Sequence, residues 1–149
     1  MMKNKNLTWT LPVLSILLFF GNCNQKNYSS SEKEPKIALS QERCLGNCES
    51  FKLNIYKKKV KYEGISNVEK KGFLSTSIKK ITVDSLISIM TTNDFELLEN
   101  EYLTNLRDLQ TIKISYNGKT VTFHKREAPE NLLVILESLV NYAHEIEKE

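Results

Sequence analysis

Glycine, proline and histidine are scarce in this chain of 149 residues, which contains five, three and two of them. Because the glycines are scattered singly, no glycine-rich loop is present to hold a phosphate group. His124 is expected on the outward face of a strand, and His144 near the C-terminal end of a helix, where a positive charge is mildly favourable. Neither histidine belongs to a recognisable catalytic or metal-binding motif, so the sequence predicts no catalytic residue, metal ligand or cofactor.

A hydrophobic run long enough to cross a membrane is also lacking. The apolar run at residues 11–20 is about ten residues long, whereas a membrane-spanning helix needs about 20. Lys3 and Lys5 precede this run, and Phe20-Gly21-Asn22-Cys23 follows it. This order is typical of a lipoprotein export signal. We therefore predict that residues 1–22 are a signal peptide and that Cys23 is acylated; the alternative is an ordinary free cysteine.

An acylated Cys23 would hold the protein on a membrane, because two or more acyl chains anchor a protein firmly. Residues 23–35 are polar and rich in serine, and we expect a flexible tether that reaches about 20 Å as a coil. The expected location is the bacterial cell envelope, where the protein is lipid-anchored to a membrane and faces the periplasm or the cell exterior.

Neither sign of charge is in large excess. The formal net charge is +3, and the lysines of the predicted signal contribute to it, so the rest of the chain is close to neutral. A nucleic-acid-binding protein would show a concentrated basic face, so no nucleic-acid partner is expected. The densest basic cluster is Lys57-Lys58-Lys59, which is expected to be a solvated turn between two strands.

The chain has three cysteines, an odd number for an exported protein. If Cys23 is acylated, Cys44 and Cys48 remain as a pair in an oxidising compartment, and we expect them to form a disulfide. Gly46 would supply the flexibility that so short a loop needs. Two alternatives stay open: a redox-active thiol pair, although the spacing is not Cys-x-x-Cys, and a metal site, although two thiolates need further ligands.

Alternating apolar residues predict an antiparallel meander in the first half of the domain. Its expected strands are residues 36–40, 51–55, 59–63 with Gly64 as the end, and 72–78. The apolar positions that share one face are Phe51, Leu53, Ile55, Val60 and Tyr62. Thr82 offers an N-cap for a helix over residues 82–92, and Pro129 lies at the start of a second helix over residues 129–147.

Asn117-Gly118 predicts a two-residue hairpin turn, because both residue types accept positive φ. Counting outward places three pairs on one face, namely Tyr116 with Lys119 and the two apolar pairs Ile114 with Val121 and Ile112 with Phe123. Lys113 and Thr122 then point to the other face. The whole pattern predicts one α+β domain over residues 36–149, in which a mainly antiparallel sheet, built of the meander and the Asn-Gly hairpin, carries two helices on one face.

A five-residue motif, Cys44-Leu45-Gly46-Asn47-Cys48, is followed by an alternating strand, a turn, and a second strand that ends Tyr62-Glu63-Gly64. From Lys36 onward the chain resembles a bacterial family known as domain of unknown function 6438, which opens with Cys-x-Gly-x-Cys and ends its second strand with Tyr-x-Gly. The family usually has Pro and Tyr where this chain has Glu49 and Phe51. The resemblance carries no assigned activity, so it implies no role for any residue.

Two classes of function remain. The first is a membrane-anchored envelope lipoprotein that is a non-catalytic binding or structural module, with an envelope protein or peptide as its partner. The second is a redox or metal-handling lipoprotein that uses Cys44 and Cys48. The membrane itself would be a partner through the lipid anchor in both classes.

Overall fold

The computed structural model describes residues 34–106 and 108–148. The predicted signal peptide, the acylation site Cys23 and most of the predicted tether lie outside these residues. The described elements, in chain order, are β1 (Ile37–Gln41), β2 (Ser50–Ile55), β3 (Lys59–Ser66), β4 (Gly72–Ser77), α1 (Lys80–Thr92), the 3₁₀ helix η1 (Phe95–Leu97), β5 (Glu101–Tyr102), β6 (Thr111–Tyr116), β7 (Lys119–His124) and α2 (Glu130–Glu147).

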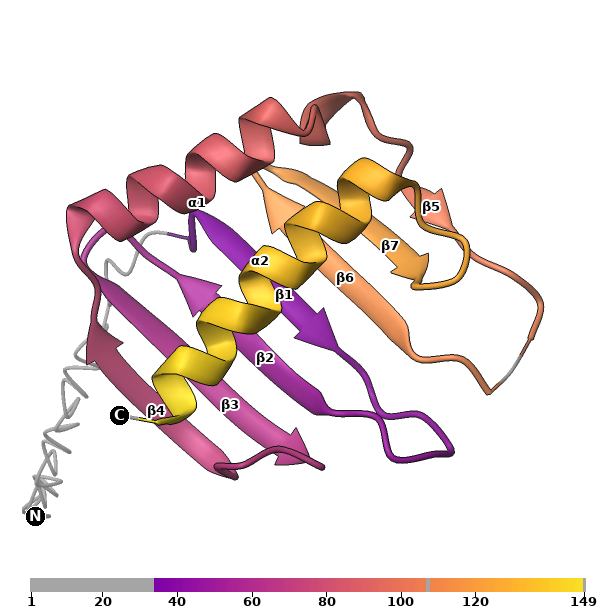
Figure 1. Cartoon of the computed structure of the whole chain (residues 1–149), viewed down its shortest axis with the longest axis horizontal. Coiled ribbons are helices and arrows are strands. Elements are labelled where there is room, and N and C mark those ends of the chain that lie inside the picture. The colour runs from indigo at the N-terminus through magenta and orange to yellow at the C-terminus, as the bar shows by residue number, and fades with distance from the viewer. Residues whose placement is uncertain (1–33, 107, 149) are drawn as a thin grey trace, which may run out of the picture. The chain divides into compact units, whose positions relative to one another are not determined.

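Seven strands form one sheet in the order β4-β3-β2-β1-β6-β7-β5. Every neighbouring pair is antiparallel except β5 and β7, which are parallel. Figure 1 shows α1 and α2 in front of the same face of this sheet, with β1 near its middle. The predicted α+β class with a mainly antiparallel sheet is confirmed. Within the described residues, no helix combines the length and the apolar composition that crossing a bilayer requires.

The core lies between the sheet and the two helices, because alternate strand residues are apolar. Phe51, Leu53 and Ile55 of β2 are fully buried, whereas Lys52 between them is exposed. The helices contribute their apolar stripes to the same cluster, with Leu86 and Met90 among the buried residues of α1 and with Leu132, Leu136 and Leu139 among those of α2. Burial of apolar side chains at roughly 25 cal/mol per Å² is the main stabilising contribution of such a core.

The turn between β6 and β7 consists of Asn117 and Gly118, which have φ angles of 51° and 81°. Tyr116 lies opposite Lys119, and Ile112 lies opposite Phe123, which are pairs expected from the sequence. The positive φ angles explain why the sequence has Asn-Gly here, since few other residues adopt them without strain.

The main differences from the sequence-based expectations concern the end of β3, the start of α1 and residues 95–102. β3 continues past Gly64 to Ser66, and α1 begins at Lys80 after an extended Lys79 rather than at a Thr82 cap. The cap position makes no side-chain hydrogen bond, so tertiary packing rather than capping sets the start of α1. Residues 95–102, for which the pattern predicts no element, contain η1 and the short parallel strand β5.

Candidate functional site

The end of the sheet where β1 stops and β2 begins contains a disulfide and several polar side chains that contact one another. We call it the disulfide end and define it by the β1–β2 connection (residues 42–49), the β3–β4 turn (residues 67–71) and residues 108–110. Cys44 and Cys48 form a disulfide within the connection, with Cα atoms 5.9 Å apart. That separation is within the usual range for a bridged pair.

Gly46, at the centre of the disulfide loop, is less constrained than expected. Positive φ angles are found at other glycines, Gly72 and Gly118, and not at Gly46. A Cβ atom added at Gly46 would meet only the Cys44 Sγ, at 3.7 Å, which is an ordinary contact. The Gly46 backbone N–H donates a hydrogen bond to this Sγ over 3.2 Å. The prediction that the loop needs the flexibility of glycine is therefore not supported by the geometry.

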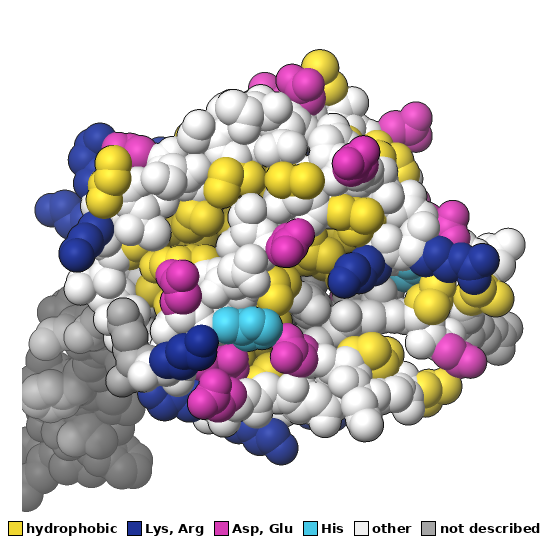
Figure 2. Space-filling model, in the orientation of Figure 1, with side chains coloured by type: hydrophobic (Ala, Val, Ile, Leu, Met, Phe, Trp, Pro, Cys, Tyr) yellow, Lys and Arg dark blue, Asp and Glu magenta, His cyan; other side chains and the backbone are white. Residues whose placement is uncertain are grey.

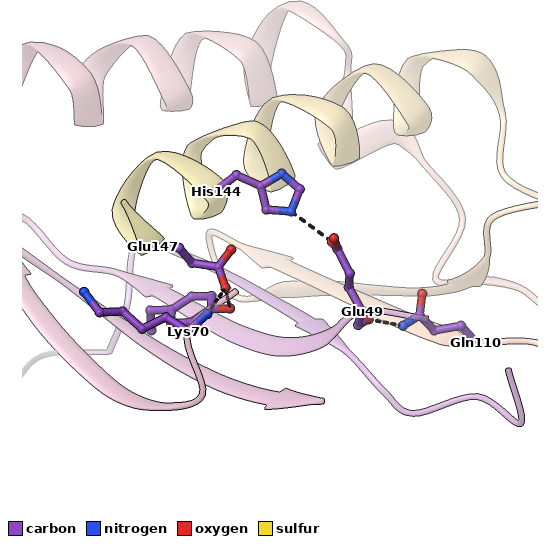
Figure 3. A network of polar contacts seen from close by, with 6 residues as sticks. Glu49, Lys70, Gln110, His144 and Glu147 are labelled. Carbon is purple, nitrogen blue, oxygen red and sulfur yellow. Dashed lines mark hydrogen bonds and ion pairs between the residues drawn. The ribbon is translucent and has the colours of Figure 1, made fainter. Parts of the chain in front are cut away.

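Gln110 closes the β1–β2 connection from the side. Its amide Nε2 donates to the backbone oxygen of Glu42 over 2.7 Å and to that of Glu49 over 2.5 Å. The same side chain therefore ties the beginning of the connection to its end. Figure 3 shows Glu49 lying between Gln110 on one side and His144 of α2 on the other.

Glu49 also joins the connection to the last turns of α2. Its Oε2 lies 2.9 Å from the His144 Nε2, and both side chains are less than half exposed. The sequence places His144 near the end of a helix, as observed, but contains no signal for its partner, which is 95 positions away. A partly exposed pair of this kind contributes modestly to stability, so its main effect is to hold the connection near α2.

A second contact, between Tyr62 of β3 and Glu147 at the end of α2, is buried. The Tyr62 hydroxyl donates a hydrogen bond to the Glu147 Oε1, and the Lys70 backbone N–H approaches the same oxygen at 3.4 Å. Only 1% of Tyr62 and 6% of Glu147 are exposed. Burial raises the pKa of the Tyr62 hydroxyl above its usual range, and the hydrogen bond to Glu147 raises the pKa further. The hydroxyl therefore stays protonated and donates to the Glu147 carboxylate.

Gly64 makes this arrangement possible. A Cβ atom at this position would lie far inside van der Waals contact with the backbone oxygen of Lys70. The β3–β4 turn therefore passes directly over Gly64, and this close approach brings the Lys70 N–H toward Glu147. The Tyr-x-Gly pattern of the sequence thus has a physical explanation, because Tyr62 and Gly64 both serve the site around Glu147.

A pocket of about 530 Å³ opens between α2 and the adjoining ends of β1 and β6. Its apolar wall comes from Ile112, Leu133, Leu136 and Val140, and its polar groups come from Gln41, Glu49, Gln110, Lys125 and Glu137. Small-molecule sites commonly combine an apolar lining with a few polar groups in a volume of about 300–1,000 Å³. In Figure 2 hydrophobic side chains remain visible on this face between acidic and basic ones.

The two histidines are not brought together. His124, expected on the outward face of β7, is only 7% exposed, and its Nδ1 accepts a hydrogen bond from the Thr104 backbone N–H over 3.2 Å. The expectation of an exposed position was wrong, because the chain between β5 and β6 covers this face. Within residues 34–106 and 108–148, no group of three His, Cys, Asp or Glu side chains is arranged to hold a metal ion.

A family model described as a domain of unknown function (DUF6438) matches residues 35–146. The match covers well over half of the chain, so the chain belongs to this family, and the predicted resemblance is confirmed. No curated protein matches the chain. The lipoprotein nature of the chain stays a prediction.

Gly64→Ala should destabilise the fold, because the new methyl group would push the Lys70 backbone away and weaken its contact with Glu147. We expect a loss of about 2–3 kcal/mol in the free energy of unfolding, the upper part of the usual range for an overpacked site. Gly46→Ala is the matched control, with an expected change within about 0.5 kcal/mol. Urea unfolding measures both variants, and equal losses would contradict the role given to Gly64.

Proposed function

We propose that this member of the family is a lipid-anchored, non-catalytic binding module of the bacterial cell envelope. The pocket between α2 and the ends of β1 and β6 carries the binding part of this proposal. The anchoring part is supported by the export-signal pattern of residues 1–22 and by Cys23 directly after it.

Contacts within the chain hold one border of the pocket in place without a ligand. One of its borders, the β1–β2 connection, is held by the disulfide, by the two hydrogen bonds from Gln110 and by the contact of Glu49 with His144. A preformed site loses less conformational entropy when a partner binds, which favours affinity.

The lining indicates the kind of partner. Leu133, Leu136 and Val140 of α2 offer an apolar wall that would accept an aliphatic or aromatic side chain. Glu49 and Lys125 lie at the same pocket and would pair with charged or polar groups beside that side chain. We infer that the partner is an envelope protein or peptide that inserts an apolar residue flanked by polar ones.

A redox function of Cys44 and Cys48 is the second candidate, and one contact favours it. The Gly46 N–H that donates to the Cys44 Sγ would stabilise negative charge on that sulfur after reduction. Both cysteines are partly exposed, so a reductant would reach them.

Intact mass of the membrane-extracted protein tests the anchor. We expect a mature chain that begins at Cys23 and carries the added mass of a diacylglyceryl group, because the signal pattern places the cut directly before this residue. Cys23→Ala should leave an unprocessed precursor. A mature chain that begins elsewhere, or an unmodified Cys23, would contradict the proposal.

A photoreactive amino acid at Val140 tests the pocket in intact cells. We expect a discrete crosslinked product from this position, and none from Val134, which lies on the same helix but does not line the pocket. Leu133→Glu should abolish the product, because it places a charge on the apolar wall. Leu97→Glu, at a residue that is 81% exposed on η1, should leave the product unchanged. The same product from both valine positions would exclude the pocket as the binding site.

Thiol titration of the folded protein in glutathione buffers separates the two candidates. For a binding module we expect the Cys44–Cys48 disulfide to resist reduction by glutathione, as structural disulfides do. We also expect Cys44→Ser with Cys48→Ser to fold, since a loop of this size contributes only about 2 kcal/mol in the chain-entropy model. A pair that is reduced and reoxidised within the glutathione range would favour the redox function instead.

A further inference from the structure

Three segments that are distant in sequence meet at one side of the end of the sheet opposite the disulfide end, and the β6–β7 turn, which Glu96 contacts, lies at its other side. The Lys36 N–H donates to the Ile55 oxygen over 2.7 Å, so the entry to β1 lies beside the end of β2. The Ile78 N–H donates to the Lys58 oxygen over 3.1 Å, so the β4–α1 connection lies against the β2–β3 turn. We call this region the Lys36 end and define it by residues 34–38, 56–61 and 78–84.

The Lys36 end is strongly basic, although the mature chain as a whole is close to neutral. Its segments contain seven lysines and two acidic residues. The lysines are Lys36, Lys57, Lys58, Lys59, Lys61, Lys79 and Lys80. The acidic residues are Glu34 and Asp84, and Asp84 pairs with Lys80 at 2.5 Å.

The arrangement of these lysines presents positive charge to solvent. Lys36, Lys57, Lys58 and Lys79 are exposed. The ammonium groups of Lys59 and Lys61 lie 5.4 Å and 5.5 Å from the centre of the Tyr56 ring. Figure 2 shows dark-blue side chains gathered at the left of the view, where α1 begins in Figure 1.

The chain enters the domain at this same end. Ten residues separate Cys23 from Glu34 in the sequence, and a coil of that length spans roughly 18 Å. We propose that the Lys36 end docks on the anionic phospholipid headgroups of the membrane that carries the lipid anchor. The inference rests on the proposed anchoring at Cys23, and it adds that the anchored domain has a fixed orientation on the membrane.

Docking is expected because the lipid anchor and the positive charge of the Lys36 end both favour it. A lipid anchor confines the domain to the surface, and each lysine near anionic headgroups then favours the docked state by about fivefold. The attraction decays over about 8 Å at physiological ionic strength, so only the end nearest the membrane is affected. Because β1 leads the chain from the Lys36 end to the disulfide end, docking would turn the pocket away from the membrane and toward a partner.

Lysine acetylation, measured residue by residue by mass spectrometry, tests the inference on the full-length protein reconstituted in vesicles. One set contains phosphatidylglycerol with phosphatidylethanolamine, and the other contains phosphatidylcholine alone. We expect Lys57, Lys58 and Lys79 to react several-fold more slowly on the anionic vesicles, and Lys71 to react equally on both. The protection should vanish in about 1 M salt, where the screening length falls to about 3 Å.

Two triple variants, each of which removes three positive charges, test the same docking. Lys57→Gln with Lys58→Gln and Lys79→Gln should shift the ratio of docked to undocked protein by on the order of a hundredfold, seen as faster acetylation of Lys36. The control removes three exposed charges elsewhere, by Lys71→Gln, Arg126→Gln and Lys148→Gln, and should leave the rate at Lys36 unchanged.

Equal acetylation on both vesicle types would overturn the inference, because the lysines would then not respond to anionic headgroups. Protection that persists in high salt would also overturn it, because steric shielding by the vesicle surface would then explain the slower reaction. Intact mass of the same sample reports acylation of Cys23 separately. An acylated protein without lysine protection would keep the anchor and reject the docking. Salt-sensitive protection on anionic vesicles without acylation would reject the anchor and keep the docking.

Discussion

The sheet depends on the pairing of β1 along both of its edges. Each residue of β1 has a partner in β2 and another in β6, so that Leu39 lies between Leu53 and Ile114. Without this five-residue strand, the meander of β2, β3 and β4 would have no link to the β6–β7 hairpin within the sheet. The pairing register of a buried central strand is also fixed, because a slip of one residue would turn its apolar side chains out of the core. The direction of β1 sets which loops share an end of the sheet.

The position of α2 follows from contacts at its C-terminal end. A carboxylate in the last turn of a helix is electrostatically unfavourable, because the C-terminal end carries partial negative charge. Glu147 is nevertheless buried there, and the Tyr62 hydroxyl and the Lys70 N–H compensate for the lost hydration. These contacts hold the helix end over β3. The rest of α2 then runs across the sheet toward β6, where the pocket opens beside it (Figure 1).

Local patterns predicted most of the sheet and both helices, because period-two and helical repeats are contained within short segments. Phe51, Leu53 and Ile55 occupy the buried face that their alternation predicts. The site was less predictable, since its residues come from distant parts of the chain. Nothing near His124 in the sequence indicates that Thr104 covers it, and nothing near Glu147 indicates burial against Tyr62. The two residues of β5 are likewise too few to form a periodic pattern.

The Lys36 end shows a limit of arguments from total charge. A nearly neutral domain excludes a uniformly basic surface, but it does not exclude a local excess that the fold assembles. Lys57-Lys58-Lys59 taken alone predicts no more than a solvated turn, and Lys79 lies 20 positions further along the chain. The hydrogen bond from the Ile78 N–H to the Lys58 oxygen brings the two groups together. Because surface potentials add over distances near the screening length, the lysines act on a neighbouring charged surface as one patch and not as separate residues.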